Sequence, residues 1–268
     1  MPGDNSSGIS IFWYLSGNTG SGPDFRRRYK MAGTIVHLVI ADLLAEEWAG
    51  LCIVTPYGNV HFEPDYFIAG NICPDGIMAR KGYVRKMKKH THFRDNIEDC
   101  DFHKRENLLT FHRRLDNFME NSFNTFKEDN IRSLYFGYLI HILADEKFML
   151  EIRPEFMENI SVTGLTEQNM EIFKYFSKDV DTIDFRLINE YKGTGRIYNA
   201  LSGIDPYEIK EMVTKEELTD SRQWILNYFF ETEHTGIEEP VYISYNRMKE
   251  FINSTVIKMK DIFKCLDK

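Results

Sequence analysis

The residues best suited to chemistry in this chain are a histidine and an aspartate four positions apart, His141 and Asp145. They interrupt an apolar run that is typical of a buried helix, and positions i and i+4 share one helix face. An imidazole and a carboxylate that converge inside an apolar wall are costly unless a partner compensates for their lost hydration. A bound cation is the commonest such partner, so the pair is a candidate metal site.

Three further candidate ligands precede this pair. His37 falls within an apolar helical pattern, Asp75 follows a proline in a turn, and His92 precedes a phenylalanine. Histidine and aspartate are ligands that suit zinc, iron or manganese. Asp75, one loop histidine and the helical pair are enough for one complete site. His37 is then a spare ligand for a second ion that shares Asp145 as a bridge.

The ordered set resembles the ligands of the zinc-dependent phospholipase C family, whose distant relatives include single-strand-specific zinc nucleases. Those proteins are all-helical and hold up to three ions, with ligands in the order His, Asp, His-Phe, HxxxD, a further His and a closing HxxxE. The resemblance covers about residues 31–150 and favours His92 over His90, because the family's ligand precedes phenylalanine. It implies a metal-dependent hydrolase that acts on a phosphoester, with zinc as cofactor.

The second half of the family's pattern is incomplete in this chain. A proline-preceded histidine does not follow the HxxxD pair, and the closing HxxxE has one formal match, His234 with Glu238, in a loop-like run. We therefore expect a pared-down relative with one zinc ion or at most two, and iron or manganese as alternatives.

The resemblance implies that a metal-activated water attacks phosphorus. Asp75, a carboxylate at the edge of the metal site, is the candidate general base for that water. Basic residues near His92 are candidates for binding the substrate's phosphate: Lys88, Lys89 and Arg94. The expected substrate is a small-molecule or lipid-headgroup phosphoester.

Two other functions stay open. An HD-type phosphohydrolase is also helical and also uses histidine and aspartate, but it needs an adjacent His-Asp doublet, and no histidine here is followed by aspartate. A non-catalytic helical binding module could retain the fold with a structural metal or none, because fold alone does not confer activity.

Composition limits the partners and the compartment. The 33 basic and 41 acidic residues among 268 give a net charge of −8, which argues against stable binding to nucleic acid or anionic membranes. No apolar run approaches the roughly 18–20 residues of a transmembrane segment. The four cysteines show no CxxC spacing and no disulfide framework, which favours a cytoplasmic protein with reduced thiols.

Apolar periodicity predicts an all-α, multi-helix bundle with the metal site in its core. The predicted helices cover residues 35–48, 65–71, 103–127, 130–151, 166–191, 206–213, 215–231 and 243–266. Residues 51–61 are expected to form a connecting loop, and residues 77–102 a basic, irregular one. Asp181 and Asp184 are expected to face water, since aspartate is mostly exposed.

The pattern favours one helical domain over residues 31–268. It has a metal-ligand half, 31–153, and a helical C-terminal half, 154–268, with residues 154–166 as the candidate seam between them. Residues 1–30 are rich in glycine and serine and have no basic segment before their apolar run. We expect a disordered or loosely attached N-terminal extension rather than a secretory signal.

Overall fold

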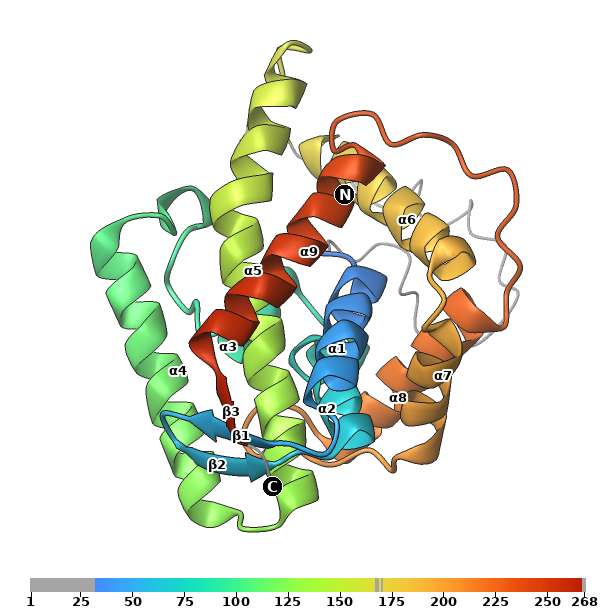
Figure 1. The fold of residues 1–268 in the computed structure, drawn as a ribbon. Coiled ribbons are helices and arrows are strands. Elements are labelled where there is room, and N and C mark those ends of the chain that lie inside the picture. Colours follow the sequence, from blue (N-terminus) through green and yellow to red (C-terminus); the bar gives the residue numbers. More distant parts are fainter. Residues whose placement is uncertain (1–31, 167–168, 170, 267–268) are drawn as a thin grey trace, which may run out of the picture.

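The computed structural model describes residues 32–166, 169 and 171–266, so the expectation for residues 1–30 lies outside the described chain. This part is mostly helical, as predicted (Figure 1). Its α-helices are α1 Thr34–Trp48, α2 Pro64–Gly70, α3 Arg85–Thr91, α4 Arg105–Thr125, α5 Asp129–Ser161, α6 Glu171–Glu190, α7 Thr194–Gly203, α8 Lys215–Ile225 and α9 Tyr245–Ile262. Shorter turns are η2 Pro74–Ala79, η3 Asp99–Asp101 and the π-helical η4 Leu226–Phe230.

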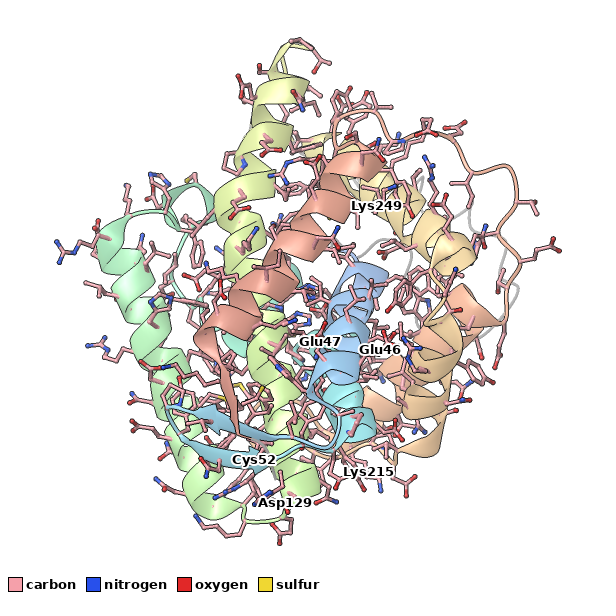
Figure 2. The ribbon with its side chains drawn as sticks, viewed as in Figure 1. Glu46, Glu47, Cys52, Asp129, Lys215 and Lys249 are labelled. Carbon is pink, nitrogen blue, oxygen red and sulfur yellow. The ribbon has the colours of Figure 1, made fainter. Side chains whose placement is uncertain are left out.

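Helix α1 lies at the centre of the fold. It contacts α2, α5, α6, α7 and α9, and most of its residues are buried (Figure 1). A helix that is apolar on nearly every face is typical of a protein core. Its exposed Glu46 and Glu47, labelled in Figure 2, pair with Arg196 at 2.9 Å and Lys260 at 2.7 Å. The polar His37 is therefore held inside the core.

Helices α2 and α5 cross at two facing glycines. A Cβ atom on Gly70 would lie 2.0 Å from the carbonyl oxygen of Leu134, and one on Gly137 would lie 2.1 Å from that of Phe67. Only glycine lets the two backbones approach this closely. The crossing brings the chain that follows α2 against the middle of α5, where His141 lies.

Helix α5 is longer than predicted. The pattern placed its end at residue 151, yet the helix passes through Pro154 and ends at Ser161. A proline in a helix removes one hydrogen bond and usually marks an end or a kink. Here Phe156 and Ile160, beyond the proline, are buried, so packing holds the last turns in place. The candidate seam at residues 154–166 thus begins inside a continuous helix.

The prediction of a loop at residues 51–61 is wrong. Strands β1 Cys52–Thr55 and β2 Gly58–His61 form an antiparallel hairpin, and β3 Lys264–Leu266 pairs with the other edge of β1. The strands are short, and β3 comes from the far end of the sequence, so the local pattern carried little signal for this sheet.

Three further predictions are wrong. Residues 206–213 are not helical and contain a β-bridge between Ile209 and Val213, whereas α7 was not predicted. The segment 77–102 contains the end of η2 and all of α3.

Asp184 is fully buried rather than exposed, and it accepts a hydrogen bond of 3.3 Å from the backbone N–H of Val36. A carboxylate is favourable there because the first N–H groups of a helix lack internal partners.

Candidate metal centre

Five buried side chains meet where α1, α5 and the η2–α3 segment come together. They are His37 on α1, Asp75 in η2, His92 directly after α3, and His141 and Asp145 on α5. Two overlapping groups have donor atoms within 4.8 Å of one another: His37, His141 and Asp145, and Asp75, His92 and His141. Such buried groups of histidine and aspartate could hold a metal ion.

The distances around His92 match those of a coordination site. Its Nε2 atom lies 3.3 Å from Nε2 of His141, 3.2 Å from Oδ2 of Asp145 and 3.3 Å from Oδ1 of Asp75. Nε2 of His141 lies 3.8 Å from Oδ2 of Asp145. Zinc bonds of about 2.0–2.1 Å in tetrahedral geometry place neighbouring ligand atoms about 3.3–3.4 Å apart. The donor atoms of His92, His141 and Asp145, 3.2–3.8 Å apart, therefore have nearly the spacing of three ligands of one tetrahedral site.

Main-chain carbonyls orient both central histidines. Nδ1 of His141 lies 2.7 Å from the carbonyl oxygen of Asn71, and Nδ1 of His92 lies 3.0 Å from that of Lys88. Because a carbonyl oxygen only accepts, Nδ1 of His141 carries a proton and donates it. Nδ1 of His92 also lies 3.0 Å from the hydroxyl oxygen of Thr91, and when this Nδ1 carries the proton of the ring it donates to the carbonyl of Lys88. In the neutral ring, the lone pair is then on Nε2 and points into the cluster. Metal-binding histidines commonly donate their second ring N–H to such a carbonyl group.

The electrostatics keep these groups in the forms that bind cations. Burial and the neighbouring His37 hold the pKa of His141 well below its ordinary value, so its ring is neutral. Burial alone would raise the pKa of Asp75, but the positive charge of Lys88 and the neighbouring His92 and His141 together outweigh it, and the net pKa is lowered. Burial raises the pKa of Asp145, but its hydrogen bond with the ring of His37 and the other surrounding contacts lower it, and the net pKa is lowered. Both carboxylates are therefore ionised.

His37 lies behind Asp145. Its Nε2 atom is 3.1 Å from Oδ1 of Asp145, and its ring stacks on that of His141 with centroids 3.8 Å apart and planes at 10°. Nε2–H of His37 can donate to Oδ1 of Asp145. The second oxygen of this carboxylate, Oδ2, lies on the side of His92. That Oδ2 atom and Nδ1 of His37 are buried without a hydrogen-bond partner within the described chain. Buried polar atoms are usually satisfied, so Oδ2 fits a ligand atom.

The three candidate phosphate-binding residues lie in different surroundings. Lys88 is buried, with Nζ 2.5 Å from Oδ1 of Asp75. Arg94 is buried, pairs with Asp99 at 3.4 Å and lines a small cavity together with His92 and Asp145. Lys89 instead contacts the carbonyl oxygen of Ile97 at 2.9 Å and Glu98 at 3.1 Å, outside the cluster.

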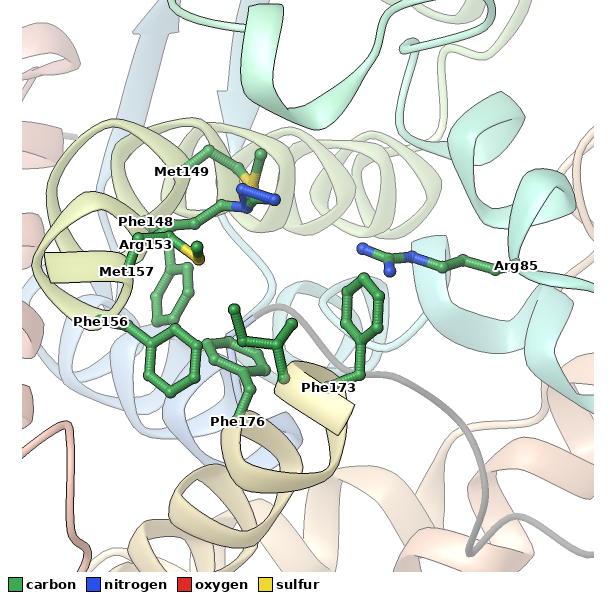
Figure 3. A pocket seen from close by; sticks show the side chains of 9 residues that line it. Arg85, Phe148, Met149, Arg153, Phe156, Met157, Phe173 and Phe176 are labelled. Atoms are coloured by element: carbon green, nitrogen blue, oxygen red, sulfur yellow. The ribbon is translucent and has the colours of Figure 1, made fainter. Parts of the chain in front are cut away.

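A larger apolar pocket adjoins that cavity (Figure 3). Its empty space, part of which is open to solvent, is about 400 Å³, and it is lined by Arg85, Phe148, Met149, Arg153, Phe156, Met157, Ile172, Phe173 and Phe176. Met149 lines both spaces. The guanidinium of Arg85 lies 4.2 Å from the ring centre of Phe173. The cavity beside the cluster therefore adjoins an apolar pocket whose lining includes two arginines, Arg85 and Arg153.

The other histidines considered as ligands lie elsewhere. His90 is exposed and pairs with Asp95 at 2.7 Å. His234 stacks on Phe185 with centroids 4.0 Å apart, and its formal partner Glu238 pairs with Lys178 at 2.6 Å. Neither His90 nor His234 belongs to the groups of candidate ligands found among the described residues.

Sequence reasoning missed the residues that support the ligands. The carbonyl of Asn71 gave no signal, because every residue has a carbonyl. The pairing of Lys88 with Asp75 joins two segments whose relative position depends on the fold. One local signal existed for Lys88, since it lies four positions before His92 and its carbonyl can contact that ring within a helical turn.

The chain matches no protein-family model, no curated protein and no solved structure in the comparisons made with each. Across residues 32–166, 169 and 171–266, every helix is too short or too polar to cross a membrane. The chemistry of the candidate centre is therefore argued from its own geometry.

Proposed function

We propose that this chain is a metal-dependent phosphoester hydrolase, similar in chemistry to the zinc-dependent phospholipase C family. One observation supports the proposal: His92, His141 and Asp145 bring three buried donor atoms within 3.2–3.8 Å of one another. A cation satisfies all three donors at once, and neutral histidine with ionised aspartate is the donor set that zinc prefers.

His92, His141 and Asp145 would hold the ion. Two histidines and one carboxylate form a common protein ligand set of catalytic zinc sites, which keep a fourth position open. Iron and manganese accept the same donors. When bound, such an ion lowers the pKa of a water molecule toward neutrality and polarises a phosphoryl oxygen.

Asp75 is the candidate hydrogen-bond acceptor for the attacking water. Its Oδ1 atom is 3.3 Å from Nε2 of His92, so a water held by the cluster falls within hydrogen-bond reach of this carboxylate. Because its pKa is lowered, Asp75 stays ionised and accepts a hydrogen bond. It would orient the water through that hydrogen bond.

Arg94 and Lys88 would bind the substrate's phosphate. Arg94 lines the same cavity as His92 and Asp145, and a guanidinium matches the geometry of phosphate oxygens. The ammonium of Lys88 lies against Asp75 on the same cluster. The substrate class is a small-molecule or lipid-headgroup phosphoester.

The test combines metal analysis with an activity panel. The purified chain is analysed for zinc, iron and manganese, and then assayed on bis(p-nitrophenyl) phosphate and p-nitrophenyl phosphate. His141→Ala tests the site, and His90→Ala, at an exposed histidine, is the matched control. We expect hydrolysis by the parent chain and the control, and its loss in His141→Ala. Unchanged hydrolysis in His141→Ala excludes the proposed role, and tightly held metal without hydrolysis favours the binding-module alternative.

A further inference from the structure

Lys88 is a buried lysine in contact with the candidate metal centre. Its side chain is 5% exposed, and Nζ lies 2.5 Å from Oδ1 of Asp75. Lysine is almost never buried at this depth without a partner of opposite charge. The main-chain carbonyl of Lys88 lies 3.0 Å from Nδ1 of His92, so both the backbone and the side chain of Lys88 contact the cluster.

The number of lone pairs limits how many ions the cluster can hold. The two groups of candidate ligands share His141. Nδ1 of His141 donates to the carbonyl of Asn71, so this ring has one free lone pair, at Nε2. One nitrogen lone pair binds one ion, and the two groups therefore cannot both be filled completely.

The charges lead to the same limit. Asp75 and Asp145 contribute two negative charges to the cluster, and Lys88 contributes one positive charge. One divalent ion would leave a small positive excess, which suits the binding of an anionic phosphoester. A second divalent ion would add two further charges in a buried space, where uncompensated charge is costly.

We propose that the ammonium of Lys88 takes the place of a second metal ion, so that the centre binds one divalent cation through His92, His141 and Asp145. The inference rests on the proposed function, because it requires that the cluster binds metal. Lys88 contacts Oδ1 of Asp75 directly and balances the charge of this carboxylate, which is then reserved for water rather than for a second ion.

The substitution Lys88→Met separates this role from ordinary structural support. Methionine is flexible and of similar length, so it fills the space without the charge. Asp75 is then buried without its partner, which lowers the melting temperature of the metal-free protein. The released carboxylate also attracts divalent cations. If Lys88 only supported the ligands, its loss would weaken metal binding by roughly 10–100-fold.

The experiment titrates zinc into the metal-free full chain against a competing chelator, and measures melting temperatures with and without zinc. Lys86→Met is the matched control, because it removes the same charge from an exposed position of the same helix. We expect one zinc ion in the parent chain and in Lys86→Met. In Lys88→Met we expect zinc to bind at least about tenfold more tightly, or a second ion to bind, with a larger rise in melting temperature.

Each other outcome has a defined meaning. Two ions in the parent chain, or equal or weaker zinc binding in Lys88→Met, overturns the inference and leaves the proposed function standing. If the parent chain binds no divalent ion, the proposed function itself fails. If Lys88→Met does not fold, the stoichiometry of the parent chain decides alone: one ion supports the inference and two overturn it.

Discussion

The Nε2 atoms of His92 and His141 lie 3.3 Å apart, while Nδ1 of each ring lies 2.7–3.0 Å from a main-chain carbonyl oxygen. When each ring donates Nδ1–H to its carbonyl, the two Nε2 lone pairs face each other, and no hydrogen bond forms between them. A cation between the two nitrogens relieves the repulsion. The carbonyl groups of Asn71 and Lys88 therefore help to make the cluster suitable for a metal ion.

His37 is expected to act through Asp145 rather than as a ligand of its own ion. The variant His37→Gln removes the ring that contacts Oδ1 of Asp145 at 3.1 Å, so this carboxylate is less well oriented. Zinc affinity should fall by about 10–100-fold with the stoichiometry unchanged at one ion. Competitive zinc titration measures both quantities. A drop from two ions to one would show instead that His37 binds a second ion.

The facing glycines of α2 and α5 are expected to be needed for the close crossing. In Gly137→Ala, the added methyl would lie 2.1 Å from the carbonyl oxygen of Phe67, so the helices must separate. Such overpacking costs about 1–3 kcal/mol, which exceeds the gain of about 1 kcal/mol in helix propensity. Urea denaturation of the metal-free protein measures the change.

The matched control for that variant is Gly195→Ala, because the space around Gly195 in α7 is open. This variant should be neutral or stabilised by up to about 1 kcal/mol. Gly137→Ala should also weaken zinc binding, since the crossing places Asn71 against His141. Equal stability of the two variants would show that the α2–α5 crossing tolerates a methyl group.

Asp99 is expected to make stability depend on pH at the acidic end. Burial raises the pKa of Asp99, but the nearby Arg94, Arg85 and Arg153 outweigh it and the net pKa is lowered. A carboxylate whose pKa is lower in the folded state stabilises the protein above its unfolded pKa, and this contribution is lost as pH falls through the folded pKa. Asp99→Asn should therefore be destabilised equally at pH 7 and pH 5.

Below about pH 4, the unfolded pKa of aspartate, the difference between Asp99→Asn and the parent chain should shrink. Denaturant unfolding at pH 7, 5 and 3.5 gives the comparison. Asp101→Asn, at a half-exposed aspartate paired with Lys104, serves as the control. A destabilisation of Asp99→Asn that does not change over this range would mean that hydrogen bonding or packing, rather than charge, accounts for it.

Metal removal is expected to destabilise the folded chain. A ligand that binds only the folded state stabilises it, by about 2.7 kcal/mol when its free concentration is 100 times the dissociation constant. Treatment with a chelator should lower the melting temperature, and zinc should restore it. Magnesium should not, because it prefers oxygen ligands. Recovery with magnesium as full as with zinc would argue against a site built on His92 and His141.

Much of the fold could be predicted because helix signals are local. The apolar pattern of residues 35–48 predicts α1 to within a residue, and the i, i+4 relation places His141 and Asp145 on one face of α5. The hairpin at residues 51–61 is not predicted because its two strands have only four residues each, and the third strand, β3, comes some two hundred residues later in the chain. Long-range pairing leaves little trace in a local window.

For the candidate site, the sequence likewise predicts the ligand residues but not the contacts that support them. The order and types of His37, Asp75, His92, His141 and Asp145 indicated which side chains to consider together, and the structure brings them together. The supporting contacts could not be predicted. Asp75 meets Lys88 only because η2 and α3 fold against each other. The tautomer of His141 depends on a carbonyl that the α2–α5 crossing delivers.

The location of a bound ion tests the central claim most directly. Crystals of the chain grown with zinc, measured on both sides of the zinc absorption edge, give an anomalous difference map. The account predicts one strong peak about 2.0–2.1 Å from Nε2 of His92, Nε2 of His141 and an oxygen of Asp145. A map without a peak among these side chains, in crystals that hold zinc elsewhere, would contradict it.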